Sequence, residues 1–268
     1  VIGNPVTVAS EASTVITPLK QYQNGVTVPH FTVTRQDQDD TNEVEQYTGL
    51  SVNSMELTVP TTGIITYSFG VEGQKPTSES SQPGSSHNDA ATTSPMAAAD
   101  VVQFWEGDSD LEDITATGTT HPWDKNPFQL LDFSLTVSPN LRQRKTIGSV
   151  GPSAAPGRGD INVTGSFRCY YNSDVDGATD RTNKTLIDKA LNDTKSSLAL
   201  YVKDAAGNGY IIDLPRVQFT NATHATPGKS EDVIVEIEFQ AYQNSLEYNP
   251  ISGVDGTTIK IASGTSLT

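Results

Sequence analysis

The sequence contains one cysteine, Cys169, so a single chain can form neither a disulfide framework nor a metal site built from several cysteines. Basic residues are also scarce: 17 Lys and Arg stand against 32 Asp and Glu, and the formal net charge is −15. This acidity disfavours wrapping of nucleic acid, because Lys and Arg supply the phosphate contacts. It does not exclude a passage through which nucleic acid slides, since a repulsive wall keeps a polyanion from sticking. Proteins of salty environments share such acidity, and that explanation stays open.

Long apolar segments are missing as well. No apolar run approaches the ~18 residues that a membrane span needs. The first residues, Val-Ile-Gly-Asn-Pro, are too short and too polar for a signal peptide, so we expect a soluble protein that is not targeted for export. Cys169 alternates with Phe167 and Tyr171 in a strand pattern, which favours a buried structural thiol over a reactive one.

Motifs for catalysis are not found. The sequence has no Gly-x-Ser-x-Gly elbow, Walker loop or Rossmann glycine pattern, and its four histidines lie far apart. Glu236 and Glu238 would lie about 7 Å apart on one face of a strand, a spacing that inverting glycosidases use. Glutamates also alternate in this way on the wet face of any amphipathic strand. We therefore expect no enzyme and no cofactor, and we place Glu236 and Glu238 on a solvent or lumen face.

Alternating apolar and polar residues predict strands over much of the chain. The clearest strand is 232–242, in which Val235, Ile237 and Phe239 alternate with polar side chains. Further strands are expected at 26–35, 101–105, 161–171 and 257–262. The segments 197–203 and 209–214 flank an Asp/Gly/Asn turn and predict a hairpin, after which Pro215 is expected to break the ladder before 216–220.

Only one good helix is predicted, at 183–193, where Leu186, Ile187, Ala190 and Leu191 form an apolar stripe and Thr182 is an N-cap candidate. The 21 Gly and 15 Pro indicate many turns. The expected fold is mainly β, a β-sandwich or barrel with one flanking α-helix and long loops. We expect a single β domain over 1–250, with a Ser/Thr/Pro-rich and acidic insertion at about 75–127, followed by a C-terminal arm at 251–268.

One strand–loop–strand unit occurs twice. Leu57-Thr58-Val59 matches 135–137, and Thr66, Ser68 and Phe69 match 164, 166 and 167. Val59 and Thr66 are 7 positions apart, whereas the corresponding Val137 and Thr164 are 27 apart, so the loop of the second copy holds 20 additional residues. The shared parts predict a duplicated β architecture.

The additional loop is basic on an acidic chain. Residues 141–160 hold one acid and four basic residues, Arg142, Arg144, Lys145 and Arg158. Residues 36–74 hold seven acids and no Lys or Arg, and 100–124 also lack Lys and Arg. This distribution suggests that copies of the protein dock on each other. Unevenly charged solvated loops would explain it equally well.

A calcium site is a second possibility to weigh. Asn172, Asp174 and Asp176 are followed by Gly177 and Asp180, which reproduces the first half of an EF-hand-type loop. The closing Glu is missing, because Asn183 stands at that position. The segment also joins a strand to a helix, where Asp and Gly accumulate in ordinary turns. A plain turn therefore stays open beside a calcium site.

The order of these elements resembles that of the tail tube proteins of long-tailed bacteriophages and related archaeal tailed viruses. The matching segments are Val-Thr-Gly-Ser-Phe at 163–167, Ser-Leu-Ala-Leu-Tyr-Val at 197–202, Gly-Asn-Gly-Tyr at 207–210, Leu-Pro-Arg-Val at 214–217 and Asp-Val-Ile-Val-Glu-Ile-Glu-Phe-Gln-Ala at 232–241. The resemblance covers roughly residues 26–242. It rests on the order of the segments, because no single motif is specific.

This resemblance implies a structural virion protein, a major tail protein that is assembled in the host cytoplasm. Six copies would close into a ring, and rings would stack, with other tail proteins, into a hollow tail tube. DNA would pass through the lumen during ejection without specific binding. The basic loop would bridge to the neighbouring ring, where its cations would meet acids such as Asp37, Asp39, Asp40 or those of the run 106–113.

A rival from another class is an extracellular β-sandwich binding module that depends on calcium bound at 172–180. A glycosidase that uses Glu236 and Glu238 is a third alternative. Assembly of the purified protein, a calcium-dependent melting temperature and turnover of glycans would separate the three.

Overall fold

The computed structural model of the 268-residue chain describes residues 16–24, 28–36, 43–73, 76–80, 95–107, 130–145, 147–148, 152–157, 159–171, 183–204, 208–225, 232–243 and 258–266. In these residues the fold is mainly β with a single short α-helix, which confirms the predicted fold class. No helix among them is long and apolar enough to cross a membrane.

The strands of the first half are β1 (Ile16–Gln23), β2 (Phe31–Gln36), β3 (Val44–Val59), β4 (Thr66–Glu72), β5 (Thr77–Glu79), β6 (Val101–Gly107) and β7 (Leu130–Ser138). Those of the second half are β8 (Arg142–Lys145), β9 (Pro152–Gly157), β10 (Asn162–Tyr170), β11 (Lys195–Lys203), β12 (Asn208–Ala225), β13 (Ile234–Ala241) and β14 (Lys260–Ser266). The helix α1 spans Asn183–Leu191, and a 3-10 turn, η1, spans Ala98–Asp100.

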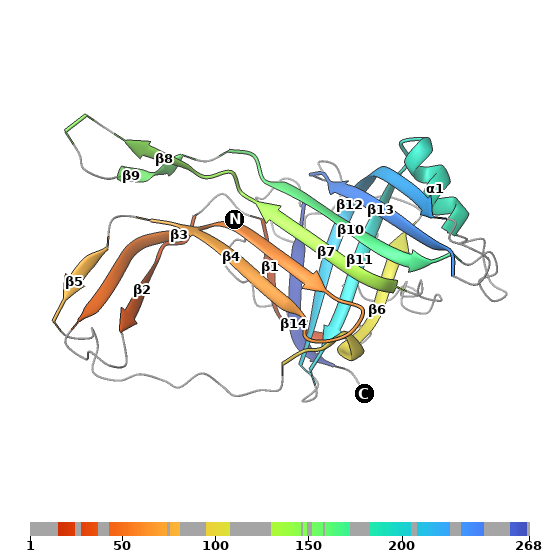
Figure 1. The fold of residues 1–268 in the computed structure, drawn as a ribbon, viewed down its shortest axis with the longest axis horizontal. Coiled ribbons are helices and arrows are strands. Elements are labelled where there is room, and N and C mark those ends of the chain that lie inside the picture. Colours follow the sequence, from red (N-terminus) through yellow and green to blue (C-terminus); the bar gives the residue numbers. More distant parts are fainter. Residues whose placement is uncertain are drawn as a thin grey trace.

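Twelve of these strands form one curled sheet (Figure 1). Its main path is β1-β14-β12-β13-β10-β7-β3-β2; β11 pairs with β12 and β6, while β4 and β5 pair with β3. The sheet curls far enough for β6 to face strands with which it does not pair. The ring of Phe104 on β6 lies 4.9 Å from that of Phe167 on β10 and 5.8 Å from that of Phe133 on β7.

The curl gives the sheet two layers: β6 and its partner β11 form the second layer, which faces β7 and β10 of the first. The core lies between the two layers. Phe219 and Phe239 complete the aromatic cluster, with ring centroids 6.2 and 6.3 Å from that of Phe167. On β13, Val235, Ile237 and Phe239 are buried whereas Glu236 and Glu238 are exposed, as the alternation predicted. A shift of one residue would bury these two carboxylates, so the register is tightly specified.

Pro215 interrupts the ladder, as predicted, but it does not end the strand, because β12 runs from Asn208 to Ala225 through the proline. Leu198 pairs with Leu214, but Ser196 pairs with Val217, so Pro215 lies in a bulge. A bulge leaves residues out of the regular ladder, and a proline there needs no backbone N–H. Here β12 also changes partners, from β14 at 208–213 to β13 at 217–225.

Two further predicted segments supply strands to the sheet. β6, within the predicted insertion at about 75–127, pairs with β11 and places Phe104 in the core. β14, within the predicted C-terminal arm at 251–268, lies between β1 and β12.

Candidate functional site

The two matched segments of the sequence form the same hairpin with the same register. Thr58 pairs with Thr66 between β3 and β4, and Thr136 pairs with Thr164 between β7 and β10. The two hairpins lie side by side, because β3 pairs antiparallel with β7 and places Leu57 opposite Leu135. The repeat in the sequence is therefore a repeat in the structure.

Six strands follow one another across this part of the sheet, in the order β4-β3-β7-β10-β13-β12, and every pair is antiparallel. We call this part the wall. Register shifts interrupt its ladders between Val52 and Ser54, between Arg168 and Cys169, and between Phe219 and Asn221. Such bulges bend strands and increase their twist, so the wall is curved.

The face of the wall that points away from the core is polar on all six strands. One row of paired residues consists of Thr66, Thr58, Ser134, Ser166, Glu238 and Asn221. The next consists of Ser68, Glu56, Thr136, Thr164, Gln240 and Gln218. A shorter row holds Asp132, Arg168, Glu236 and Thr223. The predicted residues Glu236 and Glu238 belong to this face.

Side chains on the polar face bond mainly to one another. The guanidinium of Arg168 binds the carboxylate of Asp132, with 2.7 Å from Nε to Oδ2. The hydroxyls of Ser134 and Ser166 are 3.0 Å apart, and Gln240 Nε2 donates to Asn162 Oδ1 at 3.1 Å. These contacts link neighbouring strands, and they occupy side-chain hydrogen-bond donors that could otherwise bind a ligand.

The polar face is acidic. Its rows carry the carboxylates of Glu56, Asp132, Glu236 and Glu238 against the single cation of Arg168. The hydrogen bond and the charge of Asp132 raise the pKa of Arg168 further above its usual range. Asp132 thus compensates the only positive charge in these rows, and the remaining field repels anions.

The additional loop of the second hairpin forms an arm that projects beyond the wall (Figure 1). Its strands β8 and β9 make a separate two-stranded sheet. The base of the arm is fixed: Leu141 is buried, its N–H donates to Asn53 Oδ1 at 2.8 Å, and Gly159 N donates to Asn140 O at 3.1 Å. Arg142 and Arg144 are exposed on β8, and Lys145 is the last residue of that strand.

The remaining site predictions lie outside the described residues. These are Arg158 of the arm and the calcium candidates Asn172, Asp174, Asp176 and Asp180. Within the described residues, no three His, Cys, Asp or Glu side chains gather closely enough to hold a metal ion.

The prediction of a buried Cys169 thiol is confirmed. Its side chain is fully buried in the core, and burial raises the pKa of the thiol to about 12. The thiol therefore stays protonated at neutral pH and is a poor nucleophile.

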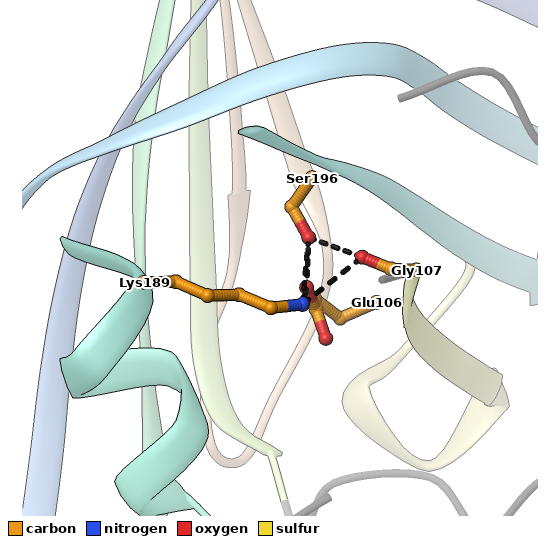
Figure 2. Close-up of polar contacts among 4 residues, drawn as sticks. All are labelled: Glu106, Gly107, Lys189 and Ser196. Carbon is orange, nitrogen blue, oxygen red and sulfur yellow. Dashed lines mark hydrogen bonds and ion pairs between the residues drawn. The ribbon is translucent and has the colours of Figure 1, made fainter. Parts of the chain in front are cut away.

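Sequence reasoning missed a buried ionic cluster between α1, β6 and β11 (Figure 2). Lys189 Nζ lies 2.6 Å from Glu106 Oε1 and 3.3 Å from both Gly107 O and Ser196 Oγ. The Ser196 hydroxyl in turn contacts Glu106 Oε1 and Gly107 O. Lys189 and Glu106 are both buried, and Ser196 is completely so. The cluster fastens the helix to the second layer.

This cluster corrects one expectation, that the acidic run 106–113 meets the basic arm of another copy. Glu106 cannot do so, because Lys189 and the core enclose it. Two spacings could have indicated that each residue faces the core, though not that the two pair: Lys189 follows buried Leu186 by three residues on a helix, and Glu106 follows Phe104 by two on a strand. The other acids of the run, and Asp37, Asp39 and Asp40, lie outside the described residues.

Comparison with known proteins agrees with this architecture. The chain matches the family described as phage tail tube protein over residues 1–241. No curated protein matches it. The family is structural, which implies a non-enzymatic component of the virion tail that assembles with itself and with other tail proteins. The match spans most of the 268 residues, and the chain belongs to the phage tail tube protein family.

Proposed function

We propose that six copies of this chain close into a ring, that rings stack into a hollow tail tube, and that DNA moves through the tube during ejection. The polar, acidic face of the wall carries this proposal. The tube would be assembled in the host cytoplasm and would serve in the virion.

A lumen for DNA has to hold a polyanion without binding it. Affinity for duplex DNA comes mainly from cations that displace counterions from phosphates, and in the rows of the wall Asp132 already engages the single guanidinium. Glu56, Glu236 and Glu238 repel phosphate, while serine and threonine hydroxyls keep the surface wet. On β3, β7, β10, β13 and β12 the opposite face belongs to the protein core, so the polar face is the one available to a lumen.

The arm would join successive rings. It projects from the wall on a fixed base and exposes Arg142 and Arg144, while the chain as a whole is acidic. An acidic surface of a copy in the next ring is the complementary partner for such an arm. The partner acids would come from segments other than the enclosed Glu106.

Electron microscopy of purified protein tests the proposal, with hollow fibres of uniform diameter and rings of six copies as the expected result. Reversing charge at Arg142, Arg144 and Lys145 together should leave the rings and the melting temperature unchanged but prevent stacking. Protein that remains monomeric at high concentration would contradict the tube. Tubes of normal length from the triple variant would show instead that the arm is not the contact between rings.

The wall has its own test. We expect that tubes of the Glu236→Lys, Glu238→Lys variant, assembled with linear duplex DNA, will protect at least about tenfold more DNA from nuclease at low salt than wild-type tubes. Rising salt should release that DNA. The variant Glu43→Lys, Glu79→Lys makes the same change of charge at exposed positions outside the three polar rows and is the matched control. Equal protection by both variants would place the lumen elsewhere.

A further inference from the structure

The root of the arm, where the chain leaves the wall, consists of a sharp turn and a tight crossing. Asn140 has a φ of 49°, a left-handed conformation that turns the chain just after β7. The returning chain crosses it at Gly159, where an added Cβ would lie 2.5 Å from Asn140 Nδ2. Beyond the root, β8 and β9 pair only with each other among the described strands. The direction of the arm is therefore decided at its root.

Asn53 of the wall bonds directly to this root. Its Oδ1 accepts the N–H of Leu141 at 2.8 Å, although the two residues lie 88 positions apart. Leu141 is buried, so its N–H needs a partner within the protein. Asn53 lies in the β3 bulge between Val52 and Ser54, where it is left out of the ladder with β4. A bulge can aim a side chain away from the regular alternation, and here that side chain reaches the arm.

Glu72 on β4 fixes which end of the Asn53 amide faces the arm. Asn53 Nδ2 donates to Glu72 Oε1 at 2.8 Å, while Asn53 Oδ1 accepts from the N–H of Leu141. A carboxylate only accepts and a backbone N–H only donates, so a flipped amide would lose both bonds. The other carboxylate oxygen of Glu72, Oε2, is buried and has no hydrogen-bond partner among the described residues. Displacing the Asn53 amide would therefore also deprive this carboxylate of a donor, which is costly for a buried charge.

The part of β3 that carries Asn53 is itself held on both sides. Ser51 pairs with Glu72 across β3 and β4, and it is completely buried. Its hydroxyl lies 2.8 Å from Nδ1 of His30, which precedes β2 on the other side of β3. Asn53 thus projects from a segment that its neighbours keep in place, and it offers the arm a fixed point of attachment.

We propose that Asn53, oriented by Glu72, is a positioning residue that sets the direction of the arm relative to the wall. The hydrogen bonds from Glu72 through Asn53 to Leu141 join β4, β3 and the arm within one subunit. The role belongs to the isolated subunit and does not depend on the surface that the arm meets. In a stacked tube, an arm with a fixed direction would lose less conformational entropy on docking than one that swings freely.

Exchanging the two polar groups tests the proposal. Asn53→Asp places two carboxyl groups at hydrogen-bond distance, and these stay together only while one of them holds a proton. We expect the arm of this variant to keep its direction at about pH 6 and to lose it at about pH 9. The double variant Asn53→Asp, Glu72→Gln again has one amide and one carboxylate, in exchanged places and with the net charge of the wild type. Its arm should keep its direction at both pH values.

Spin labels report the direction of the arm in dilute, unassembled protein. One label is attached at Ile147→Cys in the arm and the other at Leu191→Cys at the end of α1; both positions are exposed, whereas Cys169 is buried and should not react. The distribution of distances between the labels should be at least about twofold wider in Asn53→Asp at the higher pH than in the wild type. Asn221→Asp adds the same charge at an exposed position of the polar face, and this matched control should keep the wild-type distribution.

Every outcome bears on the proposal. Widening at the higher pH supports it if lowering the pH of the same sample, or making the exchange, reverses the effect. A narrow distribution in Asn53→Asp at the higher pH would overturn it, and so would an exchange variant that is as wide as the single one. Asn53→Leu, which is similar in size but lacks both bonds, should be wide at either pH, and a narrow distribution there would show that packing alone directs the arm. The melting temperature of the exchange variant should lie within about 3 °C of the wild-type value.

Discussion

Phe167→Ala is expected to lower the free energy of unfolding by about 3–5 kcal/mol, whereas Phe69→Ala should change it by less than about 0.5 kcal/mol in the monomer. The two residues hold the same position in the two hairpins. Removal of the buried Phe167 ring leaves a cavity among Phe104, Phe219 and Phe239, while Phe69 is 55% exposed. The comparison keeps the side chain and its register within the hairpin the same, whereas its burial and the neighbouring strands differ.

Urea unfolding of dilute, unassembled protein measures both effects, followed by tryptophan fluorescence. The slope of the free energy of unfolding against urea concentration should stay the same for both variants, because unfolding exposes nearly the same surface. Similar losses at the two positions would mean that β4 is covered within its own chain.

Lys189→Met should be the second severe substitution, with a loss of about 3–5 kcal/mol and a decrease of about 10 °C in melting temperature. It leaves the Glu106 carboxylate, which is 1% exposed, without its cation. Desolvation makes an unpaired charge at this depth expensive, and the Ser196 hydroxyl alone cannot replace an ammonium group.

The double variant Lys189→Met, Glu106→Leu is the control, and calorimetry is the measurement. Replacing a whole buried pair by apolar side chains is often nearly neutral, so the double variant should recover most of the lost stability. Lys203→Met removes an exposed lysine and should have little effect. A double variant as unstable as the single one would mean that the helix is held by packing and not by the charge pair.

Local patterns were sufficient to predict most strands. Alternation placed Val235, Ile237 and Phe239 in the core and Glu236 and Glu238 outside. A register shifted by one residue would bury the two carboxylates and expose the apolar side chains, so only one register is possible. The repeat predicted two like hairpins, and the position of the extra residues between β7 and β10 predicted where the arm lies. The helix followed from its apolar stripe.

Features that depend on distant partners could not be predicted in this way. Proline rules place Pro215 at the end of a strand, but the neighbouring β11 accommodates it in a bulge. Lys189 and Glu106 lie 83 positions apart, and neither residue reveals the other. The polar rows of the wall appear only once six strands are in order, since each strand contributes just two or three of their members.

The bulges of the wall have a consequence for the size of the tube. A head-to-tail contact between unlike edges can repeat without limit, so by itself it permits an open spiral as readily as a closed circle. Whether a spiral or a circle results depends on the angle by which each copy is rotated relative to the copy before it. In the proposed ring that angle would depend on the bends at Val52–Ser54, Arg168–Cys169 and Phe219–Asn221, which lie within the subunit. The diameter of the channel would then be encoded in the curvature of one molecule, and insertion or deletion of a single residue at a bulge would alter it.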